Sequence, residues 1–246
     1  MKVRSVREPI LHDTIPQEQL EQAAARLPSM RPVIGPWLFF DASYGAQMAL
    51  RRFLLGERER DVLAQTARGI EAARSFLRAV LADLPPEFSR DGDVVTCPDQ
   101  HEIHLDWDAP LRSVGEMVQQ DVCILEKEGD EHVMTGAVLC FPASWTLAQK
   151  IGKPLVRIHD PVDEYSASIA ARVQRLFDGV QIGQPMWRAN ALRYDDPTLY
   201  QPRPEHDPRP VGRPDAPFLR SERQTVLRLD HPNAVAFVIH TSVMKV

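Results

Sequence analysis

The stretch VQQDVCILEKEGDEHVMTGAVLCFP, residues 118–142, decides the fold of this chain. Two runs rich in apolar and β-branched residues flank a charged segment, with Gly129 and Asp130 near its tip. This pattern predicts a β-hairpin, because glycine and aspartate adopt the backbone angles that tight hairpin turns require. Pro142 then ends the second run. An antiparallel strand pair therefore lies near the middle of the chain.

Helical and strand-like patterns on both sides of this hairpin predict the rest of the architecture. Apolar residues recur at helical spacing in segments 47–65, 69–84 and 166–180, and a shorter helix, capped by Ser144 and ended by Gly152, is predicted over 144–152. Strand patterns cover residues 93–98, 101–107, 185–194 and 218–243, with a second hairpin turn at 230–233. The order predicts an α+β fold with an antiparallel sheet rather than alternating βαβ units. Residues 1–36 are rich in proline and contain one helical stretch at 17–27. This pattern predicts an N-terminal arm that packs on the surface of the main domain.

Composition narrows the classes of function. The 246 residues, 43% of them hydrophobic, suffice for one large domain, and a net charge of −5 favours neither nucleic acid nor an anionic membrane. No run approaches the roughly 18 apolar residues of a membrane helix, and the N-terminus lacks a signal-peptide core. Three scattered cysteines without a CxxC pair indicate a reducing compartment and argue against a cysteine-ligated metal. We therefore expect a cytoplasmic protein.

Short catalytic signatures are missing from the sequence. It contains no GxGxxG, P-loop, GxSxG or HExxH motif, so Rossmann, nucleotide triphosphatase, serine hydrolase and zincin chemistry lose their usual markers. HEIH at residues 101–104 places two histidines three positions apart in a strand. Such side chains point to opposite faces, which argues against a shared metal ion.

Polar residues on the late strands are the main candidates for a binding site. Alternation groups them by face: Arg220, Glu222 and Gln224 on one side of their strand with Arg223 on the other, Arg188 and Asn190 together, and His240 with Ser242. A solvated outer sheet face is the explanation that spacing alone favours. The alternative is an inner face that lines a ligand pocket, because buried polar groups need partners.

His159 is the second candidate. It lies in VRIHDPVDEY, residues 156–165, where Pro161 stiffens the predicted loop after it. An ordinary loop histidine is the common explanation of such a residue. A neutral imidazole is also a frequent axial ligand of haem iron, which needs only one such protein ligand.

Four ordered blocks carry a resemblance to a known family. They are DASYGAQMALRRFLLGERERDVL at 41–63, residues 114–162 from VGEMVQQ to VRIHDPV, QPMWRANALRYDDPTLY at 184–200, and FLRSERQTVLRLDHPNAVAFVIHTSV at 218–243. Together they resemble the haem-dependent oxidative N-demethylase family, of the α-subunit type related to dimethylamine monooxygenase. The resemblance implies a PAS-like haem-binding domain over residues 37–246, in which helices cover the concave face of an antiparallel sheet and haem b with its iron lies between them. The arm at 1–36 resembles the family poorly.

The resemblance also implies roles for individual residues. The family's IHxPVP motif falls on His159, which becomes the expected proximal haem ligand, although Asp163 stands where proline is usual. The family's RxN and RxERQ strands fall on the remaining expected haem-site residues, Arg188, Asn190, Arg220, Glu222, Arg223 and Gln224. We expect Glu222 nearest the oxygen and the amine, with Arg220 or Arg188 as its positive partner. The last strand reads FVIHTS where the family commonly reads FTIRTY, so His240 becomes a second candidate iron ligand or distal hydrogen-bond donor.

The implied activity is that of a haem-dependent monooxygenase that removes an N-methyl group from a small amine with dioxygen. Electrons would come from a separate reductase protein or subunit, because the chain carries no flavin, nicotinamide or iron–sulfur signature. A haem-binding PAS-like sensor or carrier is the alternative from another class, since a fold does not dictate a function. A haem-free family member with a small-molecule pocket is the third.

Overall fold

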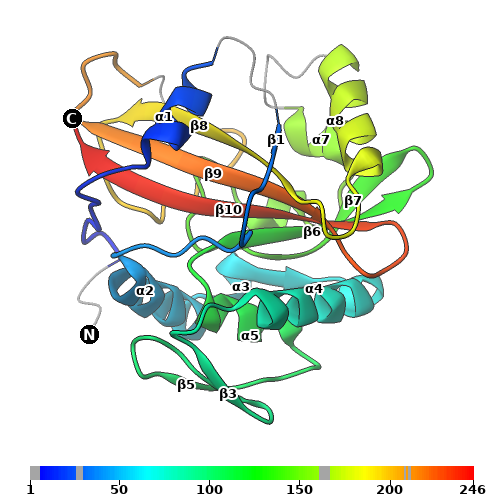
Figure 1. Ribbon diagram of the computed structural model, residues 1–246. Coiled ribbons are helices and arrows are strands. Elements are labelled where there is room, and N and C mark those ends of the chain that lie inside the picture. The colour runs from blue at the N-terminus through cyan, green and yellow to red at the C-terminus, as the bar shows by residue number, and fades with distance from the viewer. Residues whose placement is uncertain (1–5, 26–29, 161–166, 208, 210–211) are drawn as a thin grey trace.

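The computed structural model describes residues 6–25, 30–160, 167–207, 209 and 212–246 (Figure 1). Within these residues the helices are α1 Gln17–Ala23, α2 Tyr44–Glu57, α3 Glu59–Val62, the 3₁₀ turn η1 Ala67–Gly69, α4 Ile70–Asp83, α5 Pro110–Met117, α6 Leu147–Lys150, α7 Leu155–His159 and α8 Ala167–Gly179. The strands are β1 Arg31–Pro32, β2 Leu63–Gln65, β3 Ser89–Asp91, β4 Val94–Thr96, β5 Glu102–His104, β6 Asp121–Glu128, β7 Glu131–Val138, β8 Met186–Tyr194, β9 Phe218–Arg228 and β10 Ala234–Lys245.

A seven-stranded sheet in the order β1-β8-β9-β10-β6-β7-β2 forms the centre of the molecule, and each pair of neighbouring strands is antiparallel. The predicted hairpin is β6–β7, whose two-residue turn holds Gly129 at a φ of 60°. The second predicted hairpin is β9–β10, in which Asn233 takes the positive φ next to β10. Strand β10 pairs with β6 and joins the two hairpins. The predicted α+β class with an antiparallel sheet is confirmed.

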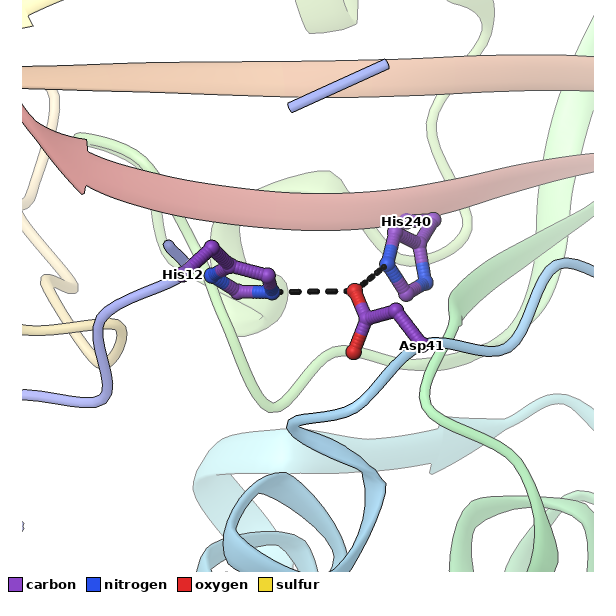
Figure 2. A group of neighbouring side chains, drawn as sticks. All are labelled: His12, Asp41 and His240. Atoms are coloured by element: carbon purple, nitrogen blue, oxygen red, sulfur yellow. Dashed lines mark hydrogen bonds and ion pairs between the residues drawn. The ribbon is translucent and has the colours of Figure 1, made fainter. Parts of the chain in front are cut away.

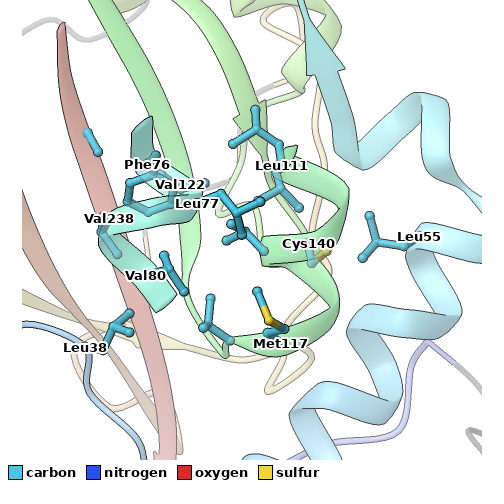
Figure 3. Packing of buried hydrophobic residues seen from close by; sticks show 14 of the residues in the cluster. Leu38, Leu55, Phe76, Leu77, Val80, Leu111, Met117, Val122, Cys140 and Val238 are labelled. Atoms are coloured by element: carbon cyan, nitrogen blue, oxygen red, sulfur yellow. The ribbon is translucent and has the colours of Figure 1, made fainter. Parts of the chain in front are cut away.

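Helices cover both faces of this sheet and give it two hydrophobic cores. On the first face, here the α4 face, α4 packs its side chains against β6 and β10, as the contacts of Phe76 and Val80 near Val122 and Val238 illustrate (Figure 3). On the opposite face, here the α8 face, α6, α7 and α8 cover a second core formed with β6, β7 and β9. Each large side chain buried in this way contributes about 1.5–3 kcal/mol.

The N-terminal segment lies on the α4 face of β8 and β9. Helix α1 packs there, as Figure 1 shows, and the side-chain amide of Gln19 donates to the Ser221 hydroxyl at 2.8 Å. Gln22 donates to the backbone oxygen of Trp187 at 3.1 Å. Both glutamines are almost fully buried, so this part of the arm belongs to the packed body of the protein.

The predicted helix over 47–65 is interrupted at Arg58, continues as α3 and is wrong for its last three residues. Helix α2 ends at Glu57, and Leu63–Gln65 form strand β2, in which Leu63 pairs with Val138 of β7. Apolar spacing fits a helix there, but the exposed edge of β7 offers backbone partners that outweigh local preference. Helices 69–84 and 166–180 are confirmed as α4 and α8, each within one residue of its predicted limits in the described residues; Ser166 lies outside them.

The segment after the central hairpin also departs from its prediction. Helix α6 begins at Leu147 after Thr146, so Ser144 is not its N-cap; Ser144 has a φ of 68° and lies outside the helix. His159, expected in a loop, is the last residue of α7. Helix α5 and strand β3 were not predicted, because each is short and lies beside a proline-containing connection.

None of the helices in the described parts of the chain is both long and apolar enough to cross a bilayer. Cys97, Cys123 and Cys140 are buried and free.

Candidate functional site

Five of the expected site residues share the α8 face of β8 and β9. Arg188 lies opposite Gln224, and Asn190 lies opposite Glu222, while Arg220 follows on the same face of β9. This is the grouping that strand alternation predicts. The solvated outer face is wrong for this group, because only 2% of Arg220 and 6% of Gln224 is exposed.

A chain of hydrogen bonds connects these side chains to the Glu222 carboxylate. Glu222 Oε2 accepts from Asn190 Nδ2 at 3.2 Å and from Gln224 Nε2 at 3.1 Å. Gln224 Oε1 in turn accepts from Arg188 Nε at 2.8 Å. Burial lowers the pKa of Arg188 from its ordinary value, and the negative charge of Glu222 opposes this. Asn190 and Gln224 thus fix Oε2 of Glu222. Gln224 also fixes the guanidinium of Arg188, which lies opposite it on β8.

Arg220 lies beneath the same carboxylate. Its guanidinium donates to the backbone oxygens of Phe141 at 2.7 Å and Leu199 at 3.2 Å. Its Nε is buried, has no hydrogen-bond partner among the residues that the structure describes, and lies 3.7 Å from Glu222 Oε1. Arg220 therefore ties two connecting segments to β9 and places a fixed positive charge next to Glu222.

His159 approaches this side of the sheet from α7. Its Nδ1 lies 2.8 Å from the backbone oxygen of Leu155, one helical turn earlier. Because a carbonyl oxygen only accepts, Nδ1 carries a proton and donates to Leu155. Burial, and the positive charges of Lys150 and Arg188, lower the pKa of His159, while the bond to Leu155 opposes them. The ring is therefore anchored through Nδ1, and its burial favours the neutral imidazole, which is the form that coordinates metals.

Arg223 and His240 do not belong to this group. They lie opposite each other on the α4 face of β9 and β10, on the other side of the sheet from Glu222. The Arg223 guanidinium stacks on the ring of Trp187, 3.8 Å from its centroid, and His240 is 1% exposed. The expectation that they act beside Glu222 does not agree with this geometry, because successive side chains of a strand point to opposite faces.

His240 instead joins two residues that the sequence did not single out. His12, from the N-terminal segment, and Asp41, from the segment before α2, meet it in what is here the His–Asp–His cluster (Figure 2). Asp41 Oδ2 lies 2.9 Å from His12 Nε2 and 2.8 Å from His240 Nε2. His240 and Asp41 are 199 positions apart. No sequence motif connects either residue to His12. No local signal could have found the cluster.

The protonation of the cluster follows from its outer contacts. The backbone N–H of Val243 donates to His12 Nδ1 at 3.1 Å, so His12 Nε2 carries the proton and donates to Asp41. Burial of Asp41 alone would raise its pKa, but the bonds from His12 and His240 hold that pKa well below its ordinary value. Burial lowers the pKa of His240 despite the Asp41 bond. Asp41 is thus a carboxylate anion beside a neutral His240.

The chain also matches a known protein family. The model of a family described as haem-dependent oxidative N-demethylase, alpha subunit-like, matches residues 30–246. The chain belongs to this family. The resemblance seen in the four sequence blocks is confirmed, and the match contains His159 and all the polar residues around Glu222. It begins after His12, so one member of the His–Asp–His cluster lies outside the part that the N-demethylase family model covers.

Proposed function

We propose that this chain is a haem-dependent monooxygenase that demethylates a small amine. Membership of the family supports the reaction class. The observation that carries the proposal is the position of His159, whose imidazole is anchored through Nδ1 on the same side of the sheet as the Glu222 group. In this proposal the α8 side of the sheet is the haem-binding side of a PAS-like domain over residues 37–246.

The residues on that side fit haem b. His159 offers an imidazole nitrogen for the iron, anchored through Leu155 as metal-bound histidines commonly are. The second core supplies an apolar wall from α7, α8 and β9. Arg188 is a partly buried cation near His159 and suits a haem propionate, because guanidinium groups bind carboxylates in a fixed planar geometry.

When bound, the haem would supply the oxygen chemistry, and the protein would supply position and charge. The overall reaction takes an N-methylamine, dioxygen, two electrons and two protons to the demethylated amine, formaldehyde and water. Glu222 holds the substrate: Asn190 and Gln224 fix its Oε2, and its Oε1 accepts a hydrogen bond from the protonated amine. Arg220, held by two backbone oxygens, keeps this carboxylate in place from below. Such positioning turns a bimolecular encounter into an oriented reaction.

Electrons must reach the site from another protein or subunit. The chain carries no flavin, nicotinamide or iron–sulfur signature, and the family description names an alpha subunit. A separate reductase component therefore supplies the electrons in this proposal, with a small amine and dioxygen as substrates.

The test is formaldehyde release by the haem-loaded full chain with secondary and tertiary N-methylamines and an added chemical reductant. The active chain produces one formaldehyde per methyl group removed. In Glu222→Gln the KM for the amine rises at least about tenfold, the size of a lost charge-assisted bond, with an unchanged haem spectrum. The matched control is Glu128→Gln, at the exposed hairpin turn. A haem-loaded chain that releases no formaldehyde above free haem contradicts the monooxygenase and favours the sensor or carrier.

A further inference from the structure

The His–Asp–His cluster lies on the α4 face and thus on the opposite side of the sheet from His159. Three elements that are distant in sequence converge there: the N-terminal segment, the segment before α2, and β10 (Figure 2). The side chains of His12 and His240 are 5% and 1% exposed, and that of Asp41 is 17% exposed. The cluster is enclosed on the histidine side and reaches solvent at the carboxylate.

The donor atoms lie close enough together to hold one metal ion. The three ligand atoms lie within 4.8 Å of one another, and both histidine Nε2 atoms are within 2.9 Å of Asp41 Oδ2. Metal–ligand bonds of about 2.0–2.1 Å in a tetrahedral site put neighbouring ligand atoms roughly 3.3 Å apart. The two Asp41 distances therefore have to widen by only about half an ångström. Two imidazoles with one carboxylate suit a divalent transition metal better than magnesium or calcium.

The surroundings can also accept the protons that a metal displaces. Coordination through Nε2 moves each imidazole proton to Nδ1, where metal-bound histidines need an acceptor. His12 Nδ1 lies 3.2 Å from the backbone oxygen of Val243, which accepts such a proton once Nδ1 no longer accepts from the Val243 N–H. His240 Nδ1 lies 3.4 Å from the side-chain amide of Gln120, whose Oε1 is buried without a hydrogen-bond partner. A turn of this amide gives up the bond of its Nε2 to the backbone oxygen of Phe39 and brings Oε1, which has no partner among the described residues, to His240 Nδ1 as the second acceptor.

We propose that His12, Asp41 and His240 bind one divalent transition-metal ion, of which Zn²⁺ is the probe, at a site separate from the haem. A water molecule on the exposed side of Asp41 completes the coordination. The ion ties the N-terminal segment to β10, in place of the two hydrogen bonds that Asp41 accepts from the histidines. Its role is to stabilise the fold, because ligands contributed by distant segments couple metal binding to folding.

The test measures Zn²⁺ binding by titration calorimetry to the full chain after chelator treatment, with X-ray absorption at the zinc edge. We expect one Zn²⁺ per chain and a first shell with two imidazole nitrogens. His12→Ala and Asp41→Asn weaken binding by more than about 100-fold, since even outer-shell partners contribute 10–100-fold. His101→Ala, an exposed histidine, is the matched control and binds normally.

Zinc should raise the melting temperature of the wild type and of His101→Ala but not of His12→Ala. Absence of stoichiometric binding, or equal binding by His12→Ala and Asp41→Asn, overturns the site and leaves a purely hydrogen-bonded clamp. If the variants fail to fold, the X-ray absorption spectrum of the zinc-loaded wild type decides. A first coordination shell without two imidazole nitrogens also overturns the proposed site. The outcome is independent of amine turnover, since the readout is zinc and not haem iron.

Discussion

The ion pair of Arg51 and Asp121 supports the site from inside the core. Arg51 Nη1 lies 2.5 Å from Asp121 Oδ1, and the two side chains are 0% and 1% exposed. Asp121 also accepts the backbone N–H groups of Cys140 and Phe141, each at 2.7 Å. Phe141 in turn accepts from Arg220. The pair therefore fixes the end of the central hairpin and, through it, the cation beside the proposed amine site.

Asp121→Asn keeps the shape of the side chain and removes its charge. Arg51 is then a buried cation without its anion, and breaking one partner of a buried pair costs about 3–5 kcal/mol. For a domain of this size, each kcal/mol lowers the melting temperature by about 2–4 °C. We expect a fall of roughly 6–20 °C.

The assay is urea unfolding with scanning calorimetry of the wild type and Asp121→Asn. Asp99→Asn is the matched control, because Asp99 forms an ion pair of the same length with Arg52 nearer the surface. Such a pair contributes about 0–1 kcal/mol, so the control should differ little from the wild type. A loss below about 1 kcal/mol in Asp121→Asn would refute the reasoning that an unpaired buried charge dominates the cost.

Three further outcomes follow from single residues. Arg188→Met should weaken haem binding roughly tenfold or more in a spectroscopic titration, because it removes the charge-assisted pair to a propionate that we propose for Arg188. Burial lowers the pKa of His132 below 6.5, so the unfolded chain binds more protons than the folded chain just below that pH. The free energy of unfolding should therefore fall from pH 7 to pH 5. Urea titrations at each pH should show a smaller fall in His132→Gln. Gly69→Ala should destabilise the protein by about 1–3 kcal/mol in urea unfolding, because a Cβ there would lie 2.7 Å from the Thr135 oxygen; Gly45→Ala, with open space around it, should not.

Short-range patterns predict those parts of the fold that short-range physics determines. The Gly129 turn and the alternation of Arg220, Glu222 and Gln224 need only local backbone geometry, and the structure agrees with both. Strand β2 was missed because its conformation depends on the edge of β7, which is distant in sequence. Local spacing carries no information about such an edge.

The site residues likewise include some that local patterns predict and some that only the folded chain brings together. The polar group around Glu222 follows from alternation on two adjacent strands, so sequence reasoning could assemble most of it. Alternation also separates Arg223 from Glu222, but the family motif RxERQ groups them, and the motif does not distinguish the faces of a strand. The partners of His240 come from the N-terminal segment, and only the folded chain brings His12 and Asp41 to it.

Haem titration into the purified full chain, followed by its absorption spectrum, tests the central claim most directly. The wild type and His104→Ala, a control at an exposed histidine, should bind one haem with the same Soret band. In His159→Ala the band should be shifted or lost and should return when imidazole is added, because free imidazole replaces the missing ligand. A Soret band of unchanged position and affinity in His159→Ala would contradict haem ligation by His159.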